Sequence, residues 1–383
     1  MIPFARMIKY GQVIQPLPGV KKILAASSWC MVLYENGDLY ARGRNAGSTF
    51  GDGSASNTDV IGDWKLIQSS VKDVWSSLGT TFCITMDNRV LSSGAIRGLT
   101  GGTANSTQIF TDRTSIFTDA GLAVQDIVDM SVGPYDVYAL TVSGTVYSGG
   151  TNFSGQHGTG NTTARAFALN TNFVNVKKIS SYGAQGGTFW YLDTSNTLYG
   201  TGNGSVGQLL SVSGTVSTKR VLSTDVIDYS ANINCFFIIK SDGLYCAGSQ
   251  FNGQLGDGVN SSNIGNVGRT TLFKHEQFTS APSYVYNDTY MTVVRYNDTW
   301  YVCGNVAKSG YGQNNSSASF VVNSTTVPKV SDPKWAIGNN NSYVISEFGV
   351  LHGTGTYSAA TDLLPGYTVA QYTFVPLSTA GIQ

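Results

Sequence analysis

The 383-residue chain has few charged side chains. Asp, Glu, Lys and Arg make up 12% of it, about half of the roughly 25% that is usual in soluble domains. Lys and Arg number 23, as do Asp and Glu, so the formal net charge is zero. The cations are scattered and form no basic stripe of the kind that gathers phosphate groups. We therefore expect no nucleic-acid partner.

Cysteine patterns that form disulfides or bind metals are also missing. The five cysteines are odd in number, far apart and never arranged as Cys-x-x-Cys. Cys30, Cys83 and Cys235 lie in apolar runs, which favours buried free thiols that pack as small hydrophobic side chains. This usage favours assembly in a reducing cytosol.

Segments that direct a chain to a membrane are not found. The N-terminus lacks the long apolar core of a signal peptide. No stretch approaches the roughly 18 apolar residues of a membrane span. We expect a protein that is not secreted by a signal peptide and does not insert into a membrane.

Residues that commonly carry catalysis are scarce. His157, His275 and His352 are the only histidines, and His157 and His352 replace Leu and Tyr at repeat positions. No His-Glu-x-x-His, Gly-x-Ser-x-Gly or phosphate-loop motif occurs. We predict a protein that is not an enzyme, with no catalytic residue, no cofactor and no metal, and we assign no binding residue. Paired carboxylates brought together from distant positions stay open as an alternative.

What the chain has in abundance is repetition. A hydrophobic pair, two further residues and a glycine recur seven times, with glycines 46 to 56 residues apart, at Gly43, Gly94, Gly150, Gly202, Gly248, Gly304 and Gly355. A period near fifty indicates one supersecondary unit repeated along the whole length.

The fifth unit shows the content of one repeat. A strand over residues 226–232 ends in small side chains, and an apolar strand over 235–239 leads to a tight Asp242-Gly243 turn. A third strand over 244–248 is followed by a glycine-rich loop and a more variable fourth strand. Helical periodicity is almost absent. The sequence predicts an all-β fold, a seven-bladed β-propeller with four antiparallel strands per blade.

We divide the chain into residues 1–19, an N-terminal arm or ring-closing strand, and residues 20–383, the propeller. Residues 12–18 resemble the fourth strand of a unit that lacks its first three, and residues 372–377 compete for the ring-closing role. Either segment can instead dock on another protein. The longest inter-blade stretches are 104–122, 162–175 and 260–281, whose Phe and Tyr residues suit sugar or protein binding. Passive connection is the simpler interpretation of each.

The residues 243–248, Gly-Leu-Tyr-Cys-Ala-Gly, followed by Asn-Gly-Gln-Leu-Gly-Asp-Gly over 252–258, resemble the repeat of the regulator of chromosome condensation family. The resemblance covers the chain from about residue 20 onward and implies the propeller fold. In the eponymous member it implies nucleotide exchange on a small GTPase and nucleosome binding, through acidic face residues and a basic N-terminal tail. This chain has no basic tail and no wedge-like insertion that can be matched.

Three functional hypotheses follow. The first is a non-enzymatic interaction module of a bacteriophage virion (tail, fibre-base or head surface), used for assembly or host-surface attachment. It rests on low charge, a composition rich in Asn, Ser, Thr and Gly, and unpaired cysteines. Its partners would be other virion proteins and a receptor or glycan of the host surface. The protein would assemble in the host cytoplasm and reside in the virion.

The second hypothesis is an intracellular regulator or adaptor of the GTPase-exchange-factor type. It predicts an acidic face, although the acidic residues are few and dispersed along the chain. The third hypothesis is a carbohydrate-binding propeller.

Overall fold

The computed structural model describes residues 19–26, 28–54, 59–77, 79–101, 106–182, 187–211, 214–249, 253–259, 268–288, 290–304, 317–323, 335–337, 341–345, 350–355, 364 and 371–377. Its strands form separate four-stranded antiparallel sheets, each built from four strands that are consecutive in the chain. Residues 1–18, which hold most of the proposed N-terminal arm, lie outside the described residues.

The first four sheets, or blades, hold β1 to β16, and their strands are β1 Val20–Ala25, β2 Trp29–Tyr34, β3 Leu39–Arg44, β4 Asp59–Gln68, β5 Val71–Ser77, β6 Thr80–Thr85, β7 Val90–Ala95, β8 Ser106–Asp112, β9 Ile127–Val132, β10 Asp136–Thr141, β11 Val146–Gly150, β12 Arg165–Leu169, β13 Val176–Tyr182, β14 Thr188–Asp193, β15 Leu198–Gly202 and β16 Val216–Ser223. The remaining three hold β17 Asp228–Ala231, β18 Cys235–Lys240, β19 Gly243–Gly248, β20 Arg269–Lys274, β21 Tyr284–Asn287, β22 Met291–Tyr296, β23 Thr299–Gly304, β24 Ser317–Val322, β25 Trp335–Ile337, β26 Asn341–Ile345, β27 Leu351–Gly355 and β28 Gln371–Pro376.

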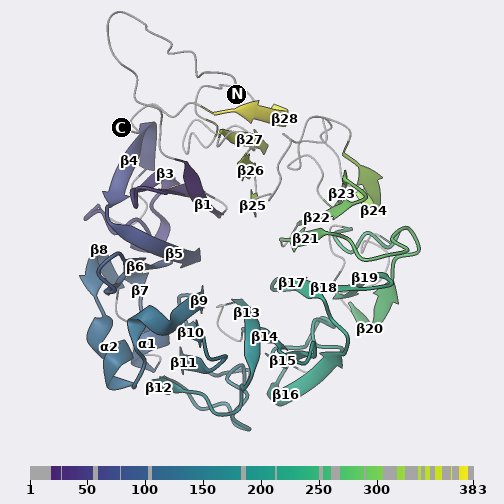
Figure 1. The fold of residues 1–383 in the computed structure, drawn as a ribbon, viewed down its shortest axis with the longest axis horizontal. Helices are drawn as coiled ribbons and strands as arrows, with labels where there is room; N and C mark the ends of the chain where they lie inside the picture. Colours follow the sequence, from purple (N-terminus) through teal and green to yellow (C-terminus); the bar gives the residue numbers. More distant parts are fainter. Residues whose placement is uncertain are drawn as a thin grey trace, which may run out of the picture.

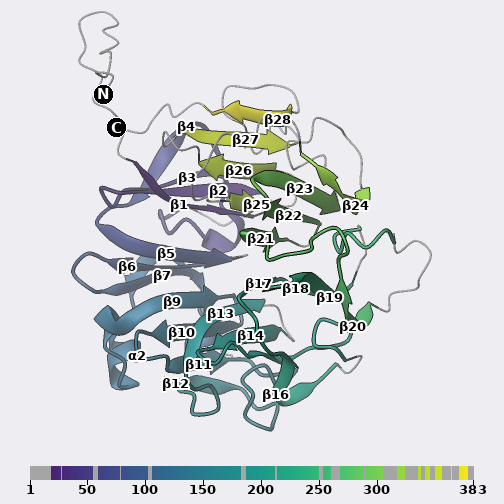
Figure 2. The ribbon, with the colours of Figure 1, turned by 45° about the vertical axis from the view of Figure 1, so that its right-hand side comes forward.

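The sheets stand radially around a central channel (Figure 1). The first strand of each sheet lies at the channel and the fourth strand lies at the rim (Figure 1). A view turned by 45° shows neighbouring sheets stacked face to face (Figure 2). The protein is therefore a β-propeller.

The glycine of the repeated phrase is the last or the second-last residue of the third strand for a steric reason. At all seven positions its φ is positive, from 76° at Gly94 to 128° at Gly355. At Gly248 an added Cβ would lie 2.3 Å from the carbonyl oxygen of Asn234, which accepts a hydrogen bond from the next residue, Ser249 N, at 2.8 Å. Only glycine permits both this backbone conformation and this close approach.

Each pair of neighbouring blades shares a cluster of buried apolar side chains. The strongly apolar second strands of both blades contribute to each cluster, because they are buried between two sheets. Blades 6 and 7 meet around Val293 and Val344. Blades 7 and 1 meet around Tyr343, Ile345, Val32 and Tyr34, so packing of side chains closes the ring.

The prediction of seven blades with four strands each needs a correction, because only six sheets have a first strand of full length. In six sheets, those of β1 to β24, the first strand has four to seven residues, whereas β25 has three. Pro333 stands two residues before β25 and lacks the N–H that a continuing ladder needs. The blades also differ in their loops, because short helices are present: α1 Arg97–Thr100, α2 Thr114–Asp119, η1 Ala46–Ser48 and η2 Val124–Asp126.

The segment 372–377, one of the two candidates for a ring-closing strand, overlaps β28, which pairs with β27 as the fourth strand of the last sheet. The other candidate, residues 12–18, lies outside the described residues. The three stretches expected as long loops each contain a fourth strand, namely β8, β12 and β20. The alternation of apolar and polar residues in these strands is weak, because the fourth strand forms the partly exposed edge of each blade.

Candidate binding face

One end of the ring carries the tight turns between second and third strands, and we call it the turn face. Several of these turns bond to the start of the next blade, which places equivalent turns side by side. Val71 N donates to Gly37 O at 2.8 Å, and Val176 N donates to Gly144 O at 2.9 Å. The other end, with the glycine-rich loops after the third strands, is the loop face.

Carboxylates gather on the turn face. They come from the tight turns and from the connections between blades, at Glu35, Asp38, Asp87, Asp112, Asp119, Asp126, Asp193, Asp225, Asp242, Glu276 and Asp298. Most of these side chains are exposed. They are far apart in the chain, but the repeat spacing returns the same part of each blade to the same face. Asp119 and Asp126 lie on the connection that holds α2 and η2, the longest between described blades on this face.

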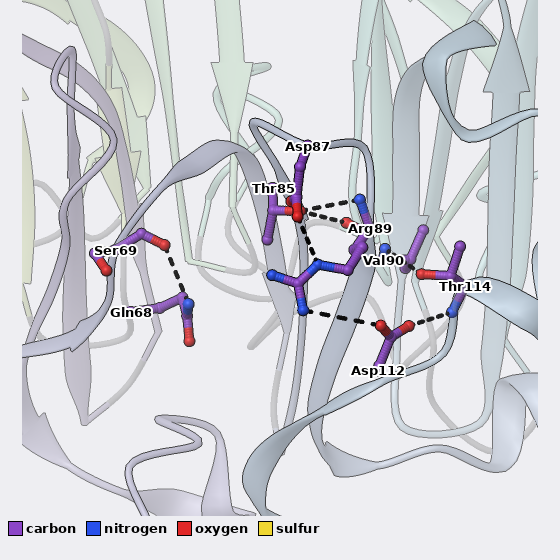
Figure 3. A network of polar contacts seen from close by, with 8 residues as sticks. All are labelled: Gln68, Ser69, Thr85, Asp87, Arg89, Val90, Asp112 and Thr114. Carbon is purple, nitrogen blue, oxygen red and sulfur yellow. Dashed lines mark hydrogen bonds and ion pairs between the residues drawn. The ribbon is translucent and has the colours of Figure 1, made fainter.

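Part of this negative charge is neutralised locally. Figure 3 shows the guanidinium of Arg89 between Asp87, at 2.9 Å, and Asp112, at 4.0 Å. A hydrogen bond from Thr85, with a second from Arg89, lowers the pKa of Asp87, and a hydrogen bond from Thr114 lowers that of Asp112. Both groups are therefore ionised at neutral pH.

The remaining turn-face carboxylates differ in whether a cation pairs with them. Lys274 pairs with Asp242 at 2.8 Å, and Arg295 pairs with Asp298 at 3.0 Å. Within the described part of the chain, no ion pair involves the exposed residues Glu35, Asp119, Asp126, Asp225 and Glu276. These five carboxylates are therefore exposed without an ion pair in the described residues, and Lys21, Lys72, Lys177 and Lys240 lie at strand ends on the same face.

Exposed cations lie toward the loop face. Arg44 is exposed at the end of β3, and Lys219 and Arg220 are exposed on β16. Two carboxylates toward this side, Asp52 and Asp257, have side chains that are 3% and 0% exposed and are paired with Lys65 and Arg269.

A collar of charged and aromatic side chains surrounds the channel on the turn-face side. It occupies equivalent positions near the start of the first strands, each paired with a residue near the end of the second strand, at Lys22, Asp73, Asp129, Lys178, Asp228 and Tyr284. Two pairs of neighbouring collar residues form ion pairs between adjacent blades. Lys22 pairs with Asp73 at 2.9 Å, and Lys178 pairs with Asp228 at 2.6 Å.

The third carboxylate of the collar is held differently. Trp75 Nε1 donates to Asp129 Oδ1 at 2.9 Å, and the Lys22 ammonium lies 4.6 Å from the Trp75 ring centroid. Burial raises the pKa of Asp129, while the Trp75 hydrogen bond and the charge of Lys22 oppose this rise. Trp75 therefore links three blades at the collar, which is a structural role for one of the tryptophans.

Next to the collar residues Lys178, Asp228 and Tyr284, the channel wall contains a cavity of about 300 Å³. Its lining comes from the first strands of three blades: Lys178 and Ser180 from β13, residues 228–231 from β17, and residues 284–287 from β21. Sequence reasoning missed this cavity, because its lining residues are about fifty positions apart and meet only when the ring closes.

The residues that sequence analysis weighed for chemistry are mostly buried in the blades. His157 is 0% exposed, and burial, with the nearby charge of Arg165, lowers its pKa to about 3. His275 lies among Phe273, Phe278 and Phe320, and burial lowers its pKa to about 4. His352 is half-buried on β27, at the repeat position that Tyr245 and Tyr301 occupy. These placements confirm the structural interpretation of His157 and His352.

All five cysteines are free and buried, as predicted. Burial raises the pKa of the Cys30, Cys83 and Cys235 thiols well above the usual range. In the part of the chain that the structure describes, no three His, Cys, Asp or Glu residues cluster as metal ligands. No helix among the same residues is long and apolar enough to cross a bilayer.

Solved structures of low sequence identity share this fold. Human WBSCR16 is 18% identical, with a TM-score of 0.64, and the match covers 85% of this chain and 88% of that one. Prp20p of Saccharomyces cerevisiae, studied for its binding to Gsp1p and histones, is 15% identical, with a TM-score of 0.52, over 94% of this chain and 77% of that one. The same yeast protein, yeast RCC1, matches in its complex with Kap60 with a TM-score of 0.51, at 15% identity over 94% and 75% of the chains.

The chain therefore has an RCC1-like β-propeller fold, as the repeat resemblance implied. No protein-family model matches the sequence. No curated protein matches it either.

Proposed function

We propose that this propeller is a non-enzymatic protein-interaction module that binds a basic partner through its turn face. The observation that carries the proposal is the gathering of exposed, ionised carboxylates on one face of a rigid ring. Complementary charge on a partner would orient the encounter and set its specificity. The imidazoles of His157 and His275 and the five thiols are buried inside the blades, which supports a binding role over one in catalysis.

Among the three hypotheses, the regulator or adaptor type fits these observations better than the virion type. The fold neighbour Prp20p binds Gsp1p and histones, and it was also solved with Kap60. The dispersed acidic residues counted against this hypothesis in the sequence, but the eleven named above lie on one face of the folded ring. The fold likeness alone assigns no partner to this chain.

The experiment compares a turn-face variant with a control on another surface. The triple variant Glu35→Lys, Asp225→Lys and Glu276→Lys reverses exposed charges that have no ion pair in the described part of the chain. Asp63→Lys, exposed on the outer strand β4, makes the same chemical change away from the turn face. Binding of the full chain to core histones and to a Gsp1p-type GTPase is measured by biolayer interferometry at several salt concentrations.

Wild-type protein should bind at least one of these basic or GTPase probes, with affinity that falls as salt rises. The triple variant should bind at least tenfold more weakly, and Asp63→Lys should bind like wild type. Equal binding by the triple variant would contradict the turn face as the contact surface. Release of labelled GDP from the GTPase distinguishes an exchange factor from an adaptor.

The virion hypothesis, with its cytoplasmic assembly and its host-surface partners, rests on composition alone, and no similar structure supports it. Its test is the mass spectrum of purified phage particles from a source that encodes this chain. Particles that lack the chain would exclude the hypothesis and would leave the protein-interaction proposal standing.

A further inference from the structure

Exposed apolar side chains gather on the turn face at blade 3, the sheet of β9 to β12. Val128 near the start of β9 is 53% exposed, Val142 in the turn between β10 and β11 is 73% exposed, and Val174 before β13 is 50% exposed. Single exposed apolar residues are ordinary on a protein surface. A group of them on one face instead indicates a surface that a partner covers.

Backbone hydrogen bonds bring the three valines together. Val142 N donates to Asp126 O at 2.8 Å, which places the turn beside the residues that enter β9. On its other side the same turn contacts the next blade, because Val176 N donates to Gly144 O at 2.9 Å. The turn therefore lies between the segments that carry the other two valines.

The fold does not require an apolar residue at these positions. Val128 stands one residue before its collar residue, and blades 1, 2 and 4 have lysine there, at Lys21, Lys72 and Lys177. The first turn residue is Val142 in blade 3 but Thr194 in blade 4, and the N–H of each donates to the connection before its own blade. Because other blades have polar residues at both places, the apolar surface is not needed for the blade itself.

Blade 3 also has negative charge that no cation of its own neutralises. Residues 114–164 contain no Lys or Arg, although they contain four aspartates. Asp119 and Asp126 are exposed on the connection that leads into β9, and within the described residues neither forms an ion pair. Lys177 of the next blade donates to Asn196 Oδ1 in the turn of blade 4. The two carboxylates therefore remain available to a cation of a partner.

Apolar surface and unpaired carboxylates together define the partner. Removal of the valines from water favours apolar side chains, and the charges of Asp119 and Asp126 favour Lys or Arg. Nucleic acids and anionic membranes would bring more negative charge against these carboxylates. A sugar would need aromatic surface, which the valines do not offer. The group is small, so a short segment of a protein suffices to cover it.

We propose that Asp119, Asp126, Val128, Val142 and Val174 form a docking site, the blade 3 site, for a short segment of a partner protein in which apolar side chains stand next to Lys or Arg. This inference rests on the proposed function and narrows it to one sector of the turn face and one kind of partner sequence. The valines supply the desolvated contact at the centre, and the two carboxylates orient the segment.

The probe is a library of short random peptides displayed on yeast and sorted against the fluorescently labelled full chain. Enriched peptides should carry Leu, Ile, Val, Phe or Trp next to Lys or Arg, and their binding should weaken as salt rises. The enriched peptides are then synthesised, and their dissociation constants for wild type and variants are measured by fluorescence anisotropy.

The valine variant combines Val128→Lys with Val142→Thr, which installs residues that other blades have at these positions. It should bind the enriched peptides about tenfold more weakly, as expected when central contacts are lost. The aspartate variant, Asp119→Asn with Asp126→Asn, should weaken binding at low salt and much less at high salt. The matched control is Ile227→Lys, because Ile227 is 53% exposed at the position of Val128 in blade 5. This control should bind like wild type.

Four results would overturn the proposal. They are a sort that enriches no peptide, enriched peptides without apolar residues next to Lys or Arg, wild-type affinity in both the valine and the aspartate variant, and an equal loss in Ile227→Lys. Circular dichroism of each variant identifies a failure to fold. The aspartate variant changes only exposed side chains, so it carries the test if the valine variant does not fold.

The two proposals fail separately. Wild-type binding of core histones or the GTPase by the valine variant, with loss in the triple variant of the turn face, would keep the turn face as the contact surface and overturn only the blade 3 site. Peptide binding that the valine variant loses, without any binding of histones or GTPase by wild type, would support the blade 3 site and contradict the partners tested above.

Discussion

The ammonium group of Lys178 lies 2.6 Å from the carboxylate of Asp228, and the same contact recurs between Lys22 and Asp73 at 2.9 Å. Each lysine also lies over an aromatic ring of the next blade, Tyr229 at 4.9 Å or Trp75 at 4.6 Å. The two sites join blades 4 and 5 and blades 1 and 2. A repeat thus reproduces an inter-blade contact from residues about fifty positions apart.

These collar pairs should contribute little to stability. Their side chains are 30% to 45% exposed, and such pairs are worth about 1 kcal/mol or less. We expect Lys178→Met and Lys22→Met each to lower the free energy of unfolding by about that amount in urea titrations, with a smaller effect at high salt. A loss of about 3 kcal/mol or more would show that the pair behaves as a buried one.

Asp136 should make stability fall as pH rises. It begins β10, is 1% exposed, and burial raises its pKa from 3.8 to about 8, an effect that the nearby Gln156 side chain offsets only in part. The folded chain therefore keeps a proton that the unfolded chain releases. The stabilisation is fully present below about pH 4 and is lost as pH approaches 8.

Replacing Asp136 with threonine should remove this dependence. Thr80 and Thr188 occupy the same repeat position, and Thr188 donates to Asn203 O at 2.8 Å. We expect Asp136→Thr to be more stable than wild type by a margin that widens from pH 4 to pH 8, measured by thermal unfolding. A margin that stays constant over this range would show that Asp136 is not protonated in the fold.

His157 should act in the opposite direction. Burial lowers its pKa from 6.5 to about 3, so the stabilisation is present above about pH 6.5 and is lost as pH falls toward 3. Leu209 and Leu255 fill the same repeat position and are fully buried. We expect His157→Leu to gain stability relative to wild type as the solution is acidified, again measured by thermal unfolding. A gain of the same size at pH 7 and pH 4 would contradict this assignment.

The motif glycine should not tolerate alanine. At Gly248 φ is 107°, and an added Cβ would lie 2.3 Å from Asn234 O. We expect Gly248→Ala to lower the free energy of unfolding by about 3 kcal/mol or more, from backbone strain and collision together. Gly160→Ala is the control: its φ is 82° but no atom lies within 4 Å of the added Cβ, so the loss should be about 1 kcal/mol. Equal losses of unfolding free energy in Gly248→Ala and Gly160→Ala would contradict the steric explanation.

The cysteines should report unfolding. All five are buried, and burial raises their thiol pKa. Thiolates are the reactive form, so we expect almost no alkylation by iodoacetamide in the native protein and five labels after denaturation in urea, counted by intact mass. Rapid native labelling of any one cysteine would show that its blade opens locally.

The sequence predicted the blade accurately where the physical pattern is local. The strands over 235–239 and 244–248 match β18 and β19, because an apolar run and an Asp-Gly turn need only neighbouring residues. A fourth strand was predicted for each blade but not located within the long inter-blade stretches, since an edge strand such as β8 alternates poorly and is largely exposed. The shortness of the three-residue β25 was not predicted.

The candidate sites depended more on the folded ring. The positions of Asp87, Asp242 and Asp298 in equivalent turns were readable in the sequence, and they could have indicated an acidic face. Nothing in the sequence brings Asn287 together with Ser230 and Lys178, because these residues come from three different blades.

By itself, the sequence determined the repeating unit, its turns and the place of each motif glycine, because a positive φ and a hairpin are decided within a few residues. Only the tertiary structure decided which repeats meet, how the ring closes through Tyr343 and Val32, and where carboxylates and the channel cavity gather. The reason is geometric. Residues fifty positions apart become neighbours through the packing of sheets, which no local pattern in the chain records.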